Sequence, residues 1–161
     1  MKQFSFLIIM VALFLTGCTS LPDAFIYFYN QSNDTIYVAN GYCSYPEDST
    51  FVFKGESYNW DELRPEQSSC YPAEPGLYLN GYGGSWNRRI NDGNGYVSFY
   101  VIDPSTRALL ESSYTEEEYP VIVRYDLTIN DLEELNYRVV YPPSEQMQSV
   151  HMWPPYSSFE E

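Results

Sequence analysis

Short runs of aromatic and β-branched residues, separated by turn signals, predict a mainly β fold: an antiparallel β-sandwich with one or two short helices. The chain has 161 residues, including 17 Tyr, 9 Phe and 3 Trp. These residue types favour strands, where they pack well on a pleated surface. The runs are spaced as in a sandwich rather than as in βαβ units. An α+β fold is the alternative.

The first two strand candidates lie close together in the sequence. Phe25–Tyr29 is followed by the polar segment Asn30–Asp34, and Thr35–Val38 then resumes the pattern, with Ile36 and Val38 on one face. We expect these two strands to pair as a hairpin. Further strands are expected at Thr50–Lys54, Leu77–Tyr82, Tyr96–Asp103, Val121–Leu127 and Tyr137–Tyr141.

Two helix starts are expected. Thr128 is followed three residues later by Asp131, as in a capping box, and the helix should run through Asp131–Asn136. A second short helix should follow Asp103, because Pro104 suits the first helical position. The segment from Pro142 to the end holds four prolines and two terminal acids, so residues 144–161 are expected to be an irregular tail, laid over the domain through Met152 and Trp153.

The amino-terminal residues predict an export signal. Lys2 precedes ten consecutive apolar residues, Phe6–Leu15, which is too short for a membrane span of about 20 residues but suits a secretory signal. The run ends in Leu15-Thr16-Gly17-Cys18, which resembles a bacterial lipobox. That resemblance implies that Cys18 carries the lipid and that the protein is anchored in the cell envelope, at the outer membrane. The expected layout is signal 1–17, linker 18–23, one domain 24–143 and tail 144–161.

The charge balance excludes one class of partner. The chain has 22 acidic and 8 basic residues, a net charge of −14, and removal of the signal with Lys2 makes this −15. Nucleic-acid binding needs clustered Lys and Arg, so it is not expected. Contact with anionic lipid headgroups is also disfavoured, so we expect the lipid on Cys18 to hold the protein at the membrane.

Three cysteines and one histidine limit the metal chemistry. With Cys18 lipidated, Cys43 and Cys70 are expected to form a disulfide in an oxidising compartment, and two unrelated buried thiols are the alternative. No metal or other cofactor is expected, because a zinc site needs four N or S ligands. Asn91–Ser98 resembles part of a calcium loop but lacks its terminal carboxylates, so we interpret it as a turn.

No catalytic constellation is evident. The acid runs at Glu116–Glu118 and Glu133-Glu134 are expected to be solvated, and His151 lies in the Pro-rich tail without a nucleophile elbow. The aromatics allow two interpretations. They either pack within the sheets or form a ligand surface, for which Tyr78, Tyr82 and Trp86 are the candidates.

The carboxyl-terminal part carries a family resemblance. Arg124–Thr128, then Asp131-Leu132, Leu135–Tyr137 and Tyr141–Pro143, together with Asn30–Val38, resemble a family of uncharacterised Bacteroidetes lipoproteins over about residues 24–143. The resemblance implies no known activity or ligand. It does imply candidate O-glycosylation at Thr35 and Ser49. We therefore expect a non-enzymatic envelope lipoprotein that binds a glycan or a protein or has a structural role, with a carboxylate-dependent glycan-processing enzyme as the alternative.

Overall fold

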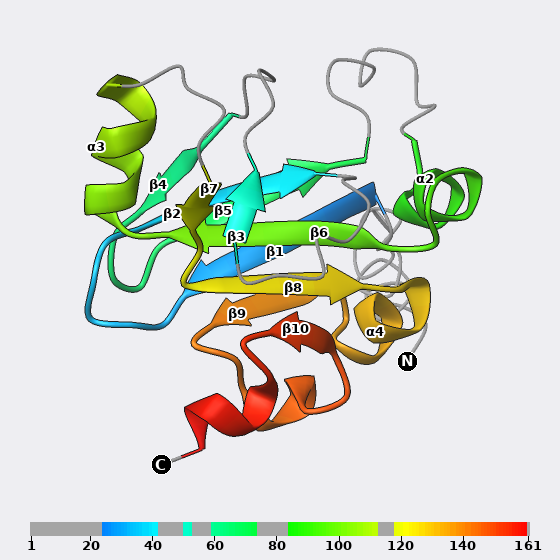
Figure 1. Cartoon of the computed structure of the whole chain (residues 1–161). Helices are drawn as coiled ribbons and strands as arrows, with labels where there is room; N and C mark the ends of the chain where they lie inside the picture. The colour runs from blue at the N-terminus through cyan, green and yellow to red at the C-terminus, as the bar shows by residue number, and fades with distance from the viewer. Residues whose placement is uncertain (1–23, 42–49, 53–58, 74–83, 113–117, 161) are drawn as a thin grey trace, which may run out of the picture.

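The computed structural model describes residues 24–41, 50–52, 59–73, 84–112 and 118–160 (Figure 1). Ten strands, three α-helices and two 3-10 helices are defined within these ranges. In chain order they are β1 (Phe25–Asn30), β2 (Ile36–Gly41), β3 (Thr50–Val52), β4 (Asp61–Leu63), β5 (Ser68–Pro72), α2 (Trp86–Asp92), β6 (Val97–Ile102), α3 (Pro104–Ser112), β7 (Glu118–Pro120), β8 (Val123–Leu127), α4 (Ile129–Glu134), β9 (Arg138–Tyr141), η3 (Glu145–Met147), β10 (His151–Trp153) and η4 (Tyr156–Phe159).

The predicted mainly β fold is confirmed. A five-stranded sheet has the order β10-β8-β6-β2-β4, a three-stranded sheet has the order β5-β1-β9, and β3 pairs with β7. Every described strand pair is antiparallel except β1 and β9, which run parallel. In Figure 1, β1 lies behind β6 and β8, and α3 lies at the opposite end of the molecule from α2 and α4.

The main core lies between the two larger sheets. Phe28 of β1 contacts Phe99 of β6 and Tyr125 of β8, with ring centroids 5.6 and 6.1 Å apart. Tyr71 of β5 meets Phe99 edge-on at 5.1 Å. All of these rings are buried, and each contributes about 1.5–3 kcal/mol or more through removal of apolar surface from water.

Tyr125 also connects the two sheets by a hydrogen bond. Its hydroxyl donates to the carbonyl oxygen of Val140 in β9, at 3.1 Å. Burial, and to a lesser extent the neighbouring Tyr141, raises the pKa of Tyr125 well above its ordinary value. The hydroxyl therefore stays protonated and remains a donor, so this bond is structural.

The expected hairpin between the first two strands is wrong. β1 lies in the three-stranded sheet between β5 and β9, whereas β2 lies in the five-stranded sheet between β6 and β4. The connecting loop passes from one sheet to the other. Because both edges of β1 are occupied by β5 and β9, no edge is left for β2.

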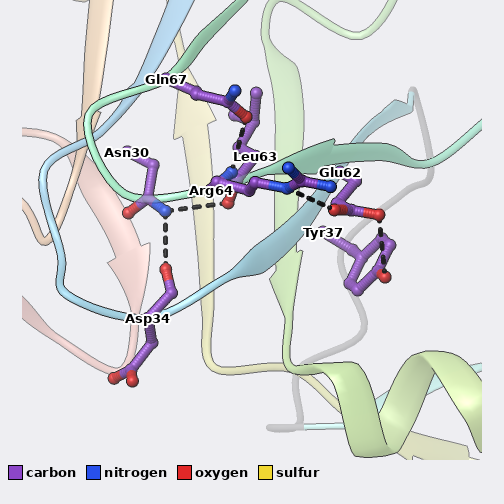
Figure 2. A network of polar contacts seen from close by, with 7 residues as sticks. All are labelled: Asn30, Asp34, Tyr37, Glu62, Leu63, Arg64 and Gln67. Carbon is purple, nitrogen blue, oxygen red and sulfur yellow. Dashed lines mark hydrogen bonds and ion pairs between the residues drawn. The ribbon is translucent and has the colours of Figure 1, made fainter.

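The buried side chain of Asn30 holds this crossing in place (Figure 2). Its Nδ2 donates to the carbonyl oxygens of Asp34, at 2.8 Å, and of Leu63 in β4, at 2.9 Å. Its Oδ1 accepts from the backbone N–H and the hydroxyl of Ser32. One amide thus ties the end of β1 to its own loop and to the edge of the other sheet.

Both predicted helix starts are confirmed, although α4 ends at Glu134, before the expected Asn136. Thr128 Oγ1 accepts from the backbone N–H of Asp131, and the Asp131 carboxylate accepts from the backbone N–H of Thr128, so α4 begins with a complete capping box. At α3, the carboxylate of Asp103 accepts from the Thr106 N–H at 2.6 Å and from the Ser105 hydroxyl at 2.9 Å. Within the described residues, no helix has the length and apolar character needed to cross a membrane.

The carboxyl-terminal segment packs on the domain through Met152, as expected, but the expectation that it is irregular is wrong. β10 adds to the edge of the five-stranded sheet, pairing His151 with Asp126 and Trp153 with Arg124. Met147, Val150 and Met152 are buried in the main core. The segment 144–161 is therefore part of the domain, because its apolar residues complete the core even though their spacing follows neither a helical nor a strand period.

The remaining strand predictions differ in their outcome. Those beginning at Thr50, Tyr96, Val121 and Tyr137 correspond to β3, β6, β8 and β9. The last three strands are shorter than expected, and residues 53 and 54 of the first prediction lie outside the described residues. The strand expected at Leu77–Tyr82 lies outside the described residues. The pattern also missed β4, β5, α2, β7 and β10, most of which are short and polar.

Candidate functional site

The three-stranded sheet presents an aromatic face away from the core. Along β1, Ile26, Phe28 and Asn30 are buried, so the alternating residues Phe25, Tyr27 and Tyr29 point outward. Tyr27 is 40 % exposed, and the other two are half-buried. The rings of Phe25 and Tyr27 lie 6.3 Å apart with planes inclined by 33°. We call these three residues the aromatic row.

The strand registers define what flanks the aromatic row. On one side, Cys70 of β5 lies opposite Tyr27. On the other side, Arg138 of β9 lies beside Tyr27 and Val140 lies beside Tyr29. Residues paired across a sheet share a face, so these side chains surround the row. The outward-facing residues of the three strands carry one positive charge and no carboxylate; they are Phe25, Tyr27, Tyr29, Ser68, Cys70, Pro72, Arg138 and Val140.

A polar groove of about 880 Å³ adjoins this face on the β9 side. Its walls come from three segments: the loop after β1, the turn between α4 and β9 together with β9 itself, and the residues around η3. Arg138 and Val140 belong both to the groove and to the sheet face. The polar lining consists of amide, hydroxyl, guanidinium and carboxylate groups, contributed by Gln31, Asn136, Arg138, Ser144, Glu145 and Gln146.

The turn between α4 and β9 has a fixed shape. Asn136 and Tyr137 have positive φ values of 50° and 59°, a conformation that costs residues other than glycine of the order of 1–3 kcal/mol. Two bonds hold it: the Tyr137 N–H donates to Leu132 O at 2.7 Å, and the Tyr137 hydroxyl donates to Asn87 Oδ1 at 2.9 Å. The groove wall at Asn136 is therefore preorganised.

A second polar cluster lies on the other face of the five-stranded sheet. The buried Asp126 carboxylate accepts from Arg124 Nε at 3.0 Å and from the Ser98 hydroxyl at 2.6 Å, and His151 Nδ1 lies 2.9 Å from it. The aspartate stands between the serine and the histidine. A serine nucleophile needs the imidazole in that middle position, so this arrangement does not activate Ser98, and the cluster joins β6, β8 and β10.

The prediction that Trp86 belongs to a ligand surface is wrong. Its side chain is fully buried in the core, and its Nε1 donates to the carbonyl oxygen of Tyr71 at 3.0 Å. It cannot present its ring to a ligand. Tyr78 and Tyr82 lie outside the described residues. The aromatic row was missed as a site, although the alternation of Phe25–Asn30 contains the signal that separates its two faces.

The other predicted sites have different outcomes. The expected disulfide is not formed in this structure, because Cys70 is a free, exposed cysteine on β5. Partial burial of its thiol raises its pKa. Its expected partner Cys43, the lipidation site Cys18 and the candidate glycosylation site Ser49 lie outside the described residues. Thr35 is half-buried immediately before β2. Within the described part of the chain, no three His, Cys, Asp or Glu side chains are grouped as metal ligands.

Comparison with protein-family models, with curated proteins and with solved structures gave no match.

Proposed function

We propose that the protein is a non-enzymatic glycan-binding lipoprotein of the bacterial cell envelope, anchored at the outer membrane through Cys18 and related to the Bacteroidetes lipoproteins that its carboxyl-terminal motif resembles. The observation that carries the glycan assignment is the side-by-side placement of the aromatic row and the polar groove, which share Arg138 and Val140.

The two parts of this surface suit the two kinds of surface on a sugar. The C–H faces of a sugar ring are apolar and stack on aromatic rings such as Tyr27, which also supply contact area at low entropic cost. The hydroxyl groups around the ring edge need both donors and acceptors. Amides, a guanidinium and a carboxylate supply both, and these are the groups that line the groove.

The proposed anchor would hold this surface near the membrane. Seven residue steps separate Cys18 from Phe25, the first residue of β1. A chain of that length spans at most about 25 Å. A diacylated or triacylated cysteine anchors stably, whereas a single chain binds only marginally. The domain would thus sample ligands close to the lipid surface.

A glycan array tests the binding function. The mature protein should bind a subset of immobilised glycans, and Tyr27→Ala and Arg138→Ala should each abolish or strongly reduce that signal. Leu109→Ala is the matched control, because Leu109 is 54 % exposed on α3, away from the groove. A signal that is unaffected by both site variants, or is absent for every glycan, contradicts the proposal.

The anchor has a separate test in a bacterial host. Cys18→Ala should abolish incorporation of a labelled fatty acid and release the protein from the membrane fraction. Unchanged acylation and membrane retention in this variant would refute lipidation at Cys18. The glycan assignment would be unaffected by that result.

A further inference from the structure

We infer that the surface takes a linear, neutral β-1,4-linked oligosaccharide, bound lengthwise along β1 over several sugar units. This inference rests on the proposed glycan-binding function and adds the class of ligand and its direction on the sheet.

The first argument is the shape of the aromatic row. Outward residues along a strand recur every two positions, about 6.8 Å apart, so Phe25 and Tyr29 are separated by about 14 Å. A single sugar ring covers one such side chain. A row of three aromatics along one strand therefore matches a ligand that repeats an apolar face along its length.

The second argument is the direction of the groove. Because β9 runs parallel to β1, the step from Arg138 to Val140 advances in the same direction as the step from Tyr27 to Tyr29. Polar groups of the groove lie beside Tyr27, through Arg138, and beyond the end of β1, through Gln31, whereas the apolar Val140 lies beside Tyr29. The edges of successive sugar rings would meet hydrogen-bonding groups on this one side.

The opposite flank of the row is less obstructed. Ser68 and Cys70, which lie opposite Tyr29 and Tyr27 on β5, are small and exposed. A ligand chain can therefore rest on the row with one edge in the groove and the other in solvent.

The linkage and the charge follow from the same surface. β-1,4-linked hexose chains extend as flat ribbons that match a straight strand, whereas α-1,4-linked chains curve away from it. The groove lining holds one guanidinium, that of Arg138, and one carboxylate, that of Glu145. The strongly acidic chain repels polyanions. A neutral sugar chain is not repelled by the acidic surface, and it needs no excess of positive charge in the groove.

Titration with sugars of increasing length tests the inference. The mature lipoprotein is kept in an amine-oxide detergent, since sugar-based detergents would compete. Calorimetry is carried out with chito- and cello-oligosaccharides from one to six units, and with malto-oligosaccharides of the same lengths. We expect the Kd for one β-linked series to fall by about tenfold or more between the monosaccharide and the tetrasaccharide, which corresponds to about 1.4 kcal/mol, and then to level off.

Variants locate the ligand on the row. Tyr27→Ala and Tyr29→Ala should each raise the Kd of the tetrasaccharide about tenfold, whereas Tyr27→Phe, which keeps the ring, should stay close to the wild type. Thermal unfolding of each variant confirms that the fold persists. Equal Kd values for one and six units, or equal binding of the malto series, overturn the lengthwise β-linked ligand while leaving a glycan-binding protein. Absence of binding to every sugar, here and on the array, rejects the glycan function itself.

Discussion

At the scale of single residues, burial separates aromatics that hold the fold from aromatics that are available to a ligand. Trp86 and Tyr27 are both aromatic, and the sequence pattern alone does not show which of the two rings is buried. Trp86 is fully buried and donates to Tyr71 O, whereas Tyr27 is 40 % exposed. Substitution of Trp86 should therefore lower stability, whereas substitution of Tyr27 should mainly weaken ligand binding.

We predict that Trp86→Ala lowers the free energy of unfolding by about 3–5 kcal/mol, because it opens a cavity and removes a buried hydrogen bond. Tyr27→Ala should cost about 1 kcal/mol or less, the range of strand propensity at an exposed position. Urea unfolding of both variants checks this. Similar costs for the two substitutions would argue against the division of roles.

The buried Arg124–Asp126 pair gives a second prediction at this scale. The two side chains are only 8 % and 1 % exposed. Asp126→Asn removes the negative charge beside a buried guanidinium, and breaking such a pair costs about 3–5 kcal/mol. Chemical denaturation measures the loss.

The control for Asp126→Asn is Glu62→Gln. Glu62 pairs with Arg64 at 3.2 Å, but these side chains are 45 % and 69 % exposed. A pair in solvent contributes about 1 kcal/mol or less. If Asp126→Asn is no more costly than Glu62→Gln, the cluster does not hold β10 and β8 together as described.

At the scale of elements, local signals predicted helix starts well and strand partners poorly. The capping box at Thr128 and the start at Pro104 depend on residues within one turn, and the structure confirmed both. The hairpin prediction failed because pairing depends on which strands occupy the edges of β1. Those strands, β5 and β9, come from distant parts of the chain.

The start of α3 leads to a prediction about pH. Partial burial alone would raise the pKa of Asp103, but the hydrogen bonds from Thr106 and Ser105 lower it below its ordinary value of 3.8. A lowered folded-state pKa gives stability that is present above pH 3.8 and is lost as the pH falls through the folded-state value. Asp103→Ala should cost about 1 kcal/mol near pH 7.

The measurement is the unfolding free energy of wild type and Asp103→Ala between pH 7 and pH 2. The difference should shrink below pH 3.8 as the wild-type carboxylate is protonated. Asp92→Ala is the control, since Asp92 is 72 % exposed and makes only a surface pair with Arg88. A constant difference across this range would show that the charge of Asp103 is not what stabilises the helix start.

At the scale of the whole molecule, the carboxyl-terminal segment completes the core. Met147 and Met152 are buried in the same core cluster as residues of both larger sheets, and β10 covers an edge of β8 (Figure 1). We predict that truncation after Pro143 prevents stable folding. Met147→Ala is the milder variant, with an expected loss of about 2–5 kcal/mol.

Thermal unfolding and soluble yield provide the readout for these variants. Gln148→Ala serves as the control, because Gln148 is exposed next to Met147. A truncated chain that unfolds at the same temperature as the full chain would mean that residues 144–161 only rest on the domain.

The sequence by itself determined the properties that depend on composition and on near neighbours: a mainly β fold class, two helix starts and a net charge of −14. The tertiary structure decided the sheet order, the burial of Trp86, the role of the carboxyl-terminal segment and the meeting of Tyr27 with Arg138. The physical reason is that strand pairing and burial are set by contacts between residues far apart in the chain. A residue pattern shows which side chains share a face of a strand, but not which distant strand lies next to it.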